Sequence, residues 1–156
     1  MSGQVSAGQK ERVRAILITP SGALLTIKRV RPGVEPYWVL PGGGVEPTDA
    51  SLEAALTREI REELAGDAVV HALVQINERG DEREYFYLAR IAHWDSGRRT
   101  GPEFADRARG EYIIETSPLT AECIARIALK PASIAELIAD HATELFQLAD
   151  LRTQTV

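Results

Sequence analysis

The pattern of apolar and polar positions along the chain predicts strands interleaved with a few helices. Segments that alternate or are rich in branched and aromatic residues predict strands, and turns rich in glycine, proline or charge separate them. The predicted strands cover residues 12–19, 23–30, 37–40, 69–77, 84–94 and 112–115. Helices are predicted over residues 50–65, 117–129 and 131–150. This order of elements indicates the α/β class.

Length and continuity predict a single domain. A chain of 156 residues can bury one sizeable core but is too short for two ordinary domains. We expect residues 1–11 to form a flexible N-terminal tail and residues 12–152 to form the domain. Residues 96–110 predict a long loop, of a length that is usually functional or disordered in compact domains.

Charge and composition narrow the classes of partner. A formal net charge of −5 disfavours a nucleic-acid polymer as partner, although it is compatible with a small phosphorylated ligand. No apolar run reaches the roughly 18 residues that a membrane span needs. Cys123 is the single cysteine, so an internal disulfide and a cysteine zinc cluster are excluded. With no apolar secretory segment at the N-terminus, the predicted location is cytoplasmic.

The candidate chemistry lies in a glycine run, Gly42–Gly44, and in the helix that follows it. This helix carries Arg58, Glu59, Glu62 and Glu63. At about 100° per residue, Glu59 and Glu63 point the same way as the apolar stripe. The stripe consists of Leu52, Leu56, Ile60 and Leu64. A solvated charged face is the simpler interpretation of such a run, but it would lie opposite the stripe.

Carboxylates on an apolar face are costly unless they are paired or bind a cation. Glu59, Glu62 and Glu63 are neighbours on one helix surface, so either a cation binds or a proton is retained. Hard oxygen ligands favour Mg²⁺ or Mn²⁺. Arg58 lies four residues before Glu62 and can orient its carboxylate. The glycine run lacks Cβ atoms, so its backbone can approach a phosphate or offer a carbonyl oxygen to a metal.

These residues resemble the signature of the Nudix hydrolases. That signature is a Gly, five residues, a Glu, seven residues, and then Arg-Glu-aliphatic-x-Glu-Glu-x-Gly-aliphatic. Residues 58–63, REIREE, match its core in order and spacing. Counted from Gly43, the first Glu of the signature falls on Asp49; counted back from Arg58, it falls on Ala50. One residue is therefore inserted before the helix.

A second departure from the signature lies at the end of the helix. Ala65 stands where the signature has Gly, and Gly66 follows it. Because glycine usually stands just past a helix C-terminus, we expect the helix to end one residue late. At the other end Thr48, Asp49 and Ser51 are all candidate N-caps.

The resemblance implies an α/β/α sandwich with a mixed sheet and a metal-dependent hydrolase. Such an enzyme cleaves the diphosphate bond of a nucleoside diphosphate linked to another moiety, by attack of water at phosphorus. By the same resemblance, the metal ligands are Glu59, Glu63 and the carbonyl of Gly42, with Glu62 assisting. The expected cofactor is Mg²⁺ or Mn²⁺, and the expected partner is a small nucleoside diphosphate derivative.

Residues outside the helix are predicted to bind substrate or supply the base. Arg29, Trp38 and Gly43 are the predicted substrate-binding residues; for Arg29 solvation of a strand end, and for Trp38 core packing, are open alternatives. Glu103, in the long loop, is predicted to be the general base, with Glu111 as the second choice. The nucleobase and the leaving group are not specified by the sequence.

Two other classes of function are compatible with the sequence. The chain could keep the Nudix fold as a non-catalytic module that senses a nucleotide or mediates an interaction. Alternatively, the last predicted helix, residues 131–150, could form a homodimer, which does not compete with catalysis for the same residues.

Overall fold

The computed structural model describes residues 10–95 and 110–153. Its strands are β1 (Lys10–Ile18), β2 (Leu24–Arg31), β3 (Val34–Val39), β4 (Gly42–Gly44), β5 (Asp67–Arg79), β6 (Glu82–His93), β7 (Glu111–Ser117) and β8 (Leu129–Lys130). Its helices are α1 (Leu52–Leu64), α2 (Ala121–Arg126) and α3 (Ala132–Asp140), with short 3₁₀ turns η4 (Leu145–Gln147) and η5 (Leu151–Thr153). None of the helices in these described ranges is long and apolar enough to cross a membrane.

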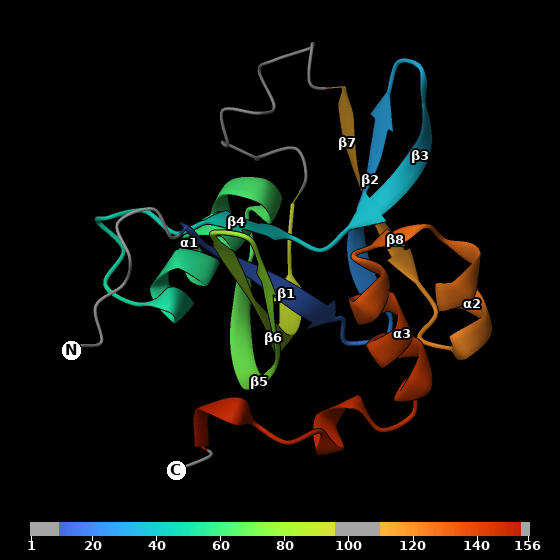
Figure 1. Cartoon of the computed structure of the whole chain (residues 1–156). Helices are drawn as coiled ribbons and strands as arrows, with labels where there is room; N and C mark the ends of the chain where they lie inside the picture. The colour runs from blue at the N-terminus through green and yellow to red at the C-terminus, as the bar shows by residue number, and fades with distance from the viewer. Residues whose placement is uncertain (1–9, 96–109, 154–156) are drawn as a thin grey trace.

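The strands form one mixed sheet in the order β5-β6-β1-β2-β3-β8, with β4 added to β1 and β7 added to β2. Strand β1 runs parallel to β6, and β3 runs parallel to β8; the other pairs are antiparallel. Residues 12–14 of β1 pair with β4, whereas Leu17 and Ile18 pair with β2. The sheet therefore divides beside β1, and the β2–β3 hairpin with β7 extends away from β5 and β6 (Figure 1).

Alternation along β1 builds two cores, one on each face of the sheet. Val13, Ala15 and Leu17 are buried in a cluster with the apolar side of α1. Ile16 and Ile18 are buried on the other face, in a cluster with residues of α2 and α3. Each fully buried aliphatic side chain contributes roughly 1.5–3 kcal/mol. The expected α/β/α sandwich with a mixed sheet is confirmed.

The helical predictions after β7 are wrong in their extent. Thr120 caps α2 by accepting a hydrogen bond from the Cys123 N–H (3.1 Å), and the helix ends at Arg126. The predicted last helix ends at Asp140, where the His141 N–H donates to the Leu137 carbonyl (3.1 Å). The apolar spacing continues beyond this point because the following turns still pack against the same core.

The predicted N-terminal tail is slightly too long, since Lys10 and Glu11 already belong to β1. The aromatic residues of β6 are all buried: Tyr85 and Tyr87 belong to the core under α1, and Phe86 belongs to the opposite core.

A C-terminal strap, residues 150–152, crosses from β5 to α1. The Arg152 guanidinium contacts the Glu53 carboxylate (3.1 Å) and donates to the His71 carbonyl (2.9 Å). Asp150 accepts a hydrogen bond from the Leu73 N–H (3.0 Å) and is paired with Arg152 (2.8 Å). The strap therefore ties the first turn of α1 to the outer strand of the sheet.

Candidate active site

Helix α1 is fixed at both ends by local interactions. Ser51 is the N-cap, and its hydroxyl accepts a hydrogen bond from the Ala54 N–H (3.0 Å). At the other end Ala65 adopts the left-handed conformation, with φ 48°. The expectation that the helix ends one residue late is therefore wrong. Gly66 serves close packing instead, because a Cβ there would lie 2.5 Å from the His93 carbonyl oxygen.

The inserted residue before the helix leaves Asp49 as the partner of Arg58. The Arg58 guanidinium donates two hydrogen bonds to the Asp49 carboxylate, at 3.0 and 2.9 Å, and a third to the Gly44 carbonyl (3.0 Å). The two hydrogen bonds from Arg58 lower the pKa of Asp49 below its ordinary value, and one from the Glu46 N–H adds to the effect. Asp49, rather than Ala50, thus holds the arginine against the glycine run.

Arg58 also contacts two carboxylates of its own helix. Its Nη1 lies 3.2 Å from Glu59 Oε2 and 3.5 Å from Glu62 Oε2. The Asp49 carboxylate is the largest cause of the raised pKa of Arg58, so its charge is permanent. These contacts place Arg58, predicted as catalytic, beside both Glu59 and Glu62.

Glu59 and Glu63 reach past the glycine run, as the helical spacing predicts. Glu63 is 7% exposed, and its Oε1 accepts a hydrogen bond from the Gly42 N–H (2.7 Å). The Glu59 side chain is 12% exposed, and its carboxylate fills the space beside Gly43. Glu62 is more open to solvent, with 32% of its side chain exposed. The glycine run itself forms the short strand β4, which is paired with β1.

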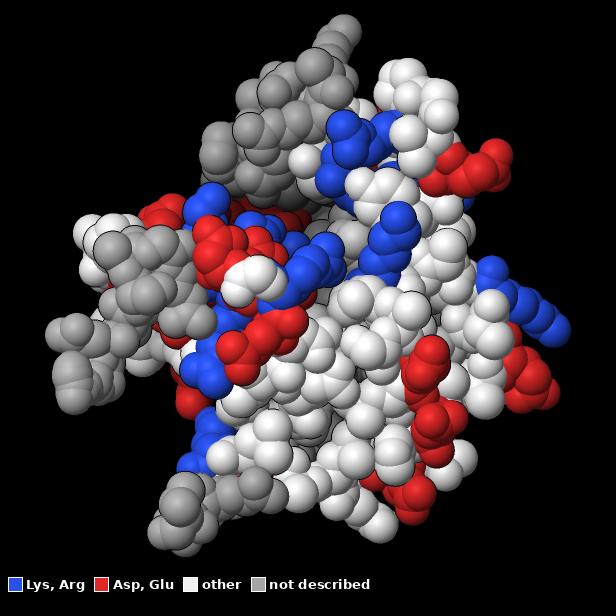
Figure 2. All heavy atoms as spheres, viewed as in Figure 1, with Lys and Arg blue, Asp and Glu red and all other residues white. Residues whose placement is uncertain are grey.

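Both inward-facing carboxylates open into one cavity of about 320 Å³. It lies where the sheet divides, and its lining includes Gly42 and the guanidinium-bearing side chains of Arg12, Arg14 and Arg29. Figure 2 shows acidic and basic side chains gathered around the hollow in the middle of this face. Among the described residues, no group of three or more His, Cys, Asp or Glu side chains is already assembled to hold a metal ion.

The sequence did not lead us to predict a role for Arg14, which contacts the predicted metal ligand Gly42. Its guanidinium donates to the Gly42 carbonyl (3.1 Å) and to the Leu40 carbonyl (3.2 Å), and it is paired with Glu84 (2.9 Å). One lone pair of the Gly42 oxygen is therefore already used. The alternation of Arg12 and Arg14 with buried residues along β1 was the available signal.

The two side chains predicted to bind substrate, those of Arg29 and Trp38, lie on opposite sides of the sheet. Arg29 lines the cavity and stacks 3.7 Å from the Tyr112 ring centre. It pairs across β2 and β3 with Tyr37, which also lines the cavity. Trp38 is the next residue and faces the other side of the sheet, where its Nε1 donates to Glu115 (2.9 Å). The expectation that Trp38 lies at the site is corrected by this alternation.

Of the two residues predicted as the general base, only Glu111 lies among the described residues. Glu103 lies outside the described residues. Glu111 begins β7 and is exposed, and its backbone carbonyl accepts a weak hydrogen bond from Arg29 Nε (3.4 Å). Glu62 remains the acidic residue closest in sequence to both Glu59 and Glu63.

Comparison with known families matches residues 8–114 to the NUDIX domain. The chain belongs to the Nudix family. Its structure is similar to the solution structure of the Escherichia coli ORF135 protein, with 25% identity, coverage of 96% of this chain and 100% of that chain, and a TM-score of 0.61. A search of curated proteins finds no significant match.

More distant solved structures share the fold. A NUDIX hydrolase from Nitrosomonas europaea is 15% identical, with 95% of this chain and 97% of that chain covered and a TM-score of 0.67. An ADP-ribose pyrophosphatase from Streptococcus suis is 17% identical, with 87% and 93% covered and a TM-score of 0.55. The predicted resemblance to the Nudix hydrolases is confirmed at the level of family and fold.

Proposed function

We propose that this chain is a hydrolase that requires Mg²⁺ or Mn²⁺ and cleaves the diphosphate bond of a nucleoside diphosphate linked to another moiety. The observation that carries this proposal is the convergence of Glu59 and Glu63, both largely shielded from water, on a cavity that also contains arginine side chains. Family membership supports a hydrolase of the pyrophosphatase type.

The donor set fits a hard divalent cation. Two shielded carboxylates on one helix face would be costly without a compensating cation, and the Gly42 N–H and Arg58 neutralise only part of that charge. Glu59, Glu63 and the second lone pair of the Gly42 carbonyl would hold the ion, with Glu62 beside them. When bound, the ion supplies charge neutralisation at the phosphates and lowers the pKa of a bound water.

Residues of the protein orient the phosphates of the substrate and the carboxylates of the site. Arg29 lines the same cavity as Glu59 and Glu63 and can pair with phosphate oxygens. Arg58 contacts both the Glu59 carboxylate, which lines the cavity, and the Glu62 carboxylate, and so restrains their orientation. Water adds to one phosphorus, the bridging P–O bond breaks, and two phosphate esters leave. A carboxylate accepts the proton of the attacking water, and we assign this role to Glu103, with Glu111 and then Glu62 as alternatives.

The activity is tested by incubating the purified protein with Mg²⁺ or Mn²⁺ and a panel of nucleoside triphosphates, nucleotide sugars, ADP-ribose and dinucleoside polyphosphates. Glu63→Gln keeps the shape but loses the charge, so it should abolish turnover at limiting Mg²⁺ while the protein stays folded. Glu53→Gln, on the strap side of the same helix, is the matched control and should stay within a few-fold of wild type. Tight nucleotide binding with no turnover by the wild type would indicate a sensing module instead.

The general base is tested separately. Glu103→Gln should lower kcat by at least about tenfold, since a positioned base contributes roughly 10²–10⁴-fold. Its melting temperature should change little. Wild-type turnover in this variant together with a crippled Glu111→Gln would move the assignment to Glu111, and full activity in both would move it to Glu62.

A further inference from the structure

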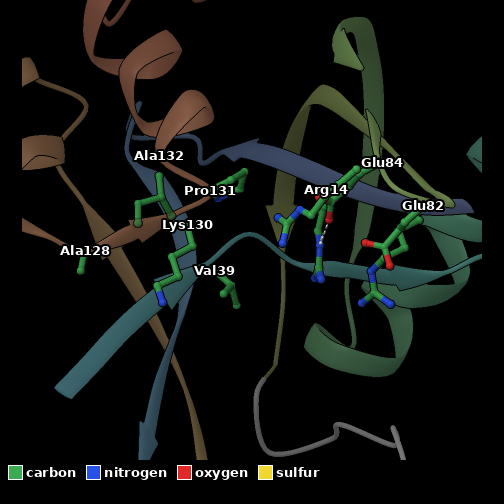
Figure 3. A pocket seen from close by; sticks show the side chains of 11 residues that line it. Arg14, Val39, Glu82, Glu84, Ala128, Lys130, Pro131 and Ala132 are labelled. Atoms are coloured by element: carbon green, nitrogen blue, oxygen red, sulfur yellow. Dashed lines mark hydrogen bonds and ion pairs between the residues drawn. The ribbon is translucent and has the colours of Figure 1, made fainter. Parts of the chain in front are cut away.

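A second and larger cavity, of about 640 Å³, adjoins the cavity of Glu59 and Glu63. The two cavities share Arg12, Arg14 and Val39 in their linings. Figure 3 shows Lys130 beside Val39 on one side of the larger cavity, with Arg14 and Glu84 across from them. A molecule whose diphosphate lies beside the carboxylates can therefore extend past β1 into this second space.

The lining of the second cavity is positively charged. Its cationic residues are Arg12, Arg14, Arg79 and Lys130, and its acidic residues are Glu82 and Glu84. Four cations against two carboxylates leave an excess of two positive charges, in a chain whose formal net charge is −5. Arg14 is paired with Glu84 (2.9 Å), but within the described ranges no ion pair or side-chain hydrogen bond engages Arg12 or Arg79. These two guanidinium groups can receive an anion without breaking an existing pair.

The rest of the lining is aliphatic. Val39, Leu129 and Pro131 contribute to it, and no described residue of the lining is aromatic. A nucleobase would therefore find no ring to stack on here. The Lys130 ammonium lies 4.7 Å from the centre of the Tyr37 ring, and Tyr37 lines the smaller cavity. Lys130 thus stands close to both cavities.

We propose that the second cavity binds a further phosphate group of the substrate, in addition to the diphosphate that is cleaved, and that Arg12 and Lys130 determine this specificity. The inference rests on the proposed function, because it takes the diphosphate to lie beside Glu59 and Glu63. A further phosphate can come from a phosphorylated ribose or from a longer polyphosphate chain. Both present the same tetrahedral anion, to which guanidinium and ammonium groups donate charge-assisted hydrogen bonds.

Binding is tested first without catalysis, by calorimetric titration of inorganic tripolyphosphate into the protein in EDTA. With no metal, Glu59 and Glu63 repel the anion from the first cavity, and the effect of replacing Lys130, which lines only the second of these two cavities, reports binding in that cavity. Arg12→Gln and Lys130→Gln should each raise Kd at least about tenfold, the effect of one charge-assisted hydrogen bond. Lys28→Gln is the matched control, because Lys28 lies over Trp38 on the other side of the β2–β3 hairpin. No binding, or equal weakening by Lys28→Gln, would overturn the proposal.

Hydrolysis then identifies the source of the phosphate. ADP-ribose is compared with its 2′-phosphate, and a nucleoside diphosphate with the corresponding triphosphate, with Mg²⁺ present. At least one pair should show a preference of about tenfold in kcat/KM for the member with the further phosphate, and Lys130→Gln should remove it. Equal kcat/KM within both pairs would refute the inference. Absence of any hydrolysis would refute the proposed function instead, and the tripolyphosphate titration would still decide whether the anion site exists.

Discussion

Replacing Gly43 by alanine should inactivate the enzyme without unfolding it. A Cβ at this position would lie 2.6 Å from Glu59 Oε2 and 2.7 Å from its Cδ. Ordinary contact begins at 3.4 Å, so the carboxylate has to move by about 0.8 Å. Mg²⁺ demands near-ideal geometry from its oxygen ligands, and a misplacement of about 1 Å at a reacting centre can cost roughly 10²-fold. We therefore expect kcat/KM to fall by about 10²-fold.

Stability should hardly change in this variant. The displaced group is the far end of a flexible side chain, and the lost contact with Arg58 is a partly exposed ion pair worth at most about 1 kcal/mol. Reduced entropy of the unfolded chain offsets part of that loss, because alanine replaces glycine. We expect the melting temperature to stay within about 3 °C of wild type.

The neighbouring glycines provide the controls. Gly44→Ala should stay within a few-fold of wild-type activity, because a Cβ there meets no atom within 4 Å. Gly42→Ala should prevent folding, because φ is 145° and its Cβ would overlap the Val13 carbonyl oxygen. The assays are steady-state hydrolysis, Mn²⁺ binding followed by electron paramagnetic resonance, and thermal unfolding. Wild-type Mn²⁺ affinity and turnover in Gly43→Ala, or equal losses in Gly44→Ala, would refute the role given to the Glu59 carboxylate.

Three further predictions concern stability. Ala65→Gly should raise the free energy of unfolding by about 0.5–1 kcal/mol, measured by chemical denaturation. The left-handed conformation costs a residue with a Cβ about 1–2 kcal/mol, and the higher entropy of the unfolded chain with glycine cancels part of the gain. An unchanged denaturation midpoint would contradict this. Thr26→Val should raise the melting temperature by about 2–4 °C, since the buried Thr26 hydroxyl has no hydrogen-bond partner among the described residues. Thr19→Val, whose hydroxyl is hydrogen-bonded, should lower it. Asp49→Asn should lower the melting temperature at pH 7, because Arg58 depresses the pKa of Asp49 and its ionised form stabilises the folded state above the ordinary pKa of 3.8. This deficit should shrink as the pH falls below 3.8, and an equal deficit at pH 7 and pH 3 would show that the charge is not responsible.

Helix α1 and its two inward carboxylates could be predicted because the relevant information is local. The positions of Glu59 and Glu63 relative to the apolar stripe follow from helical geometry alone, and the burial of Glu63 agrees with them. Whether the first Glu of the signature falls on Asp49 or on Ala50 could not be decided, because the path of the inserted residue depends on where the chain meets the glycine strand. In the structure Asp49 binds Arg58.

The cavity itself required knowledge of strand pairing. Alternation along β3 predicts that Tyr37 and Trp38 face opposite sides. Which side holds the carboxylates depends on the pairing of β2 with both β3 and β7, which the sequence does not reveal. The predicted last helix is too long for a similar reason, because its end depends on tertiary packing. Leu145 and Leu148 keep a helical spacing after the helix has ended, because packing on the core selects apolar residues in any local conformation.

The C-terminal strap has a practical consequence for handling the protein. Arg152 and Glu53 are 99 residues apart in sequence, and closing so long a loop is entropically costly, so this contact depends on everything folded between them. A purification tag or fusion partner at this end that displaced Arg152 would release the first turn of the helix that carries Glu59 and Glu63. Preparations that differ at this end should therefore be compared with an untagged protein before their kinetic constants are interpreted.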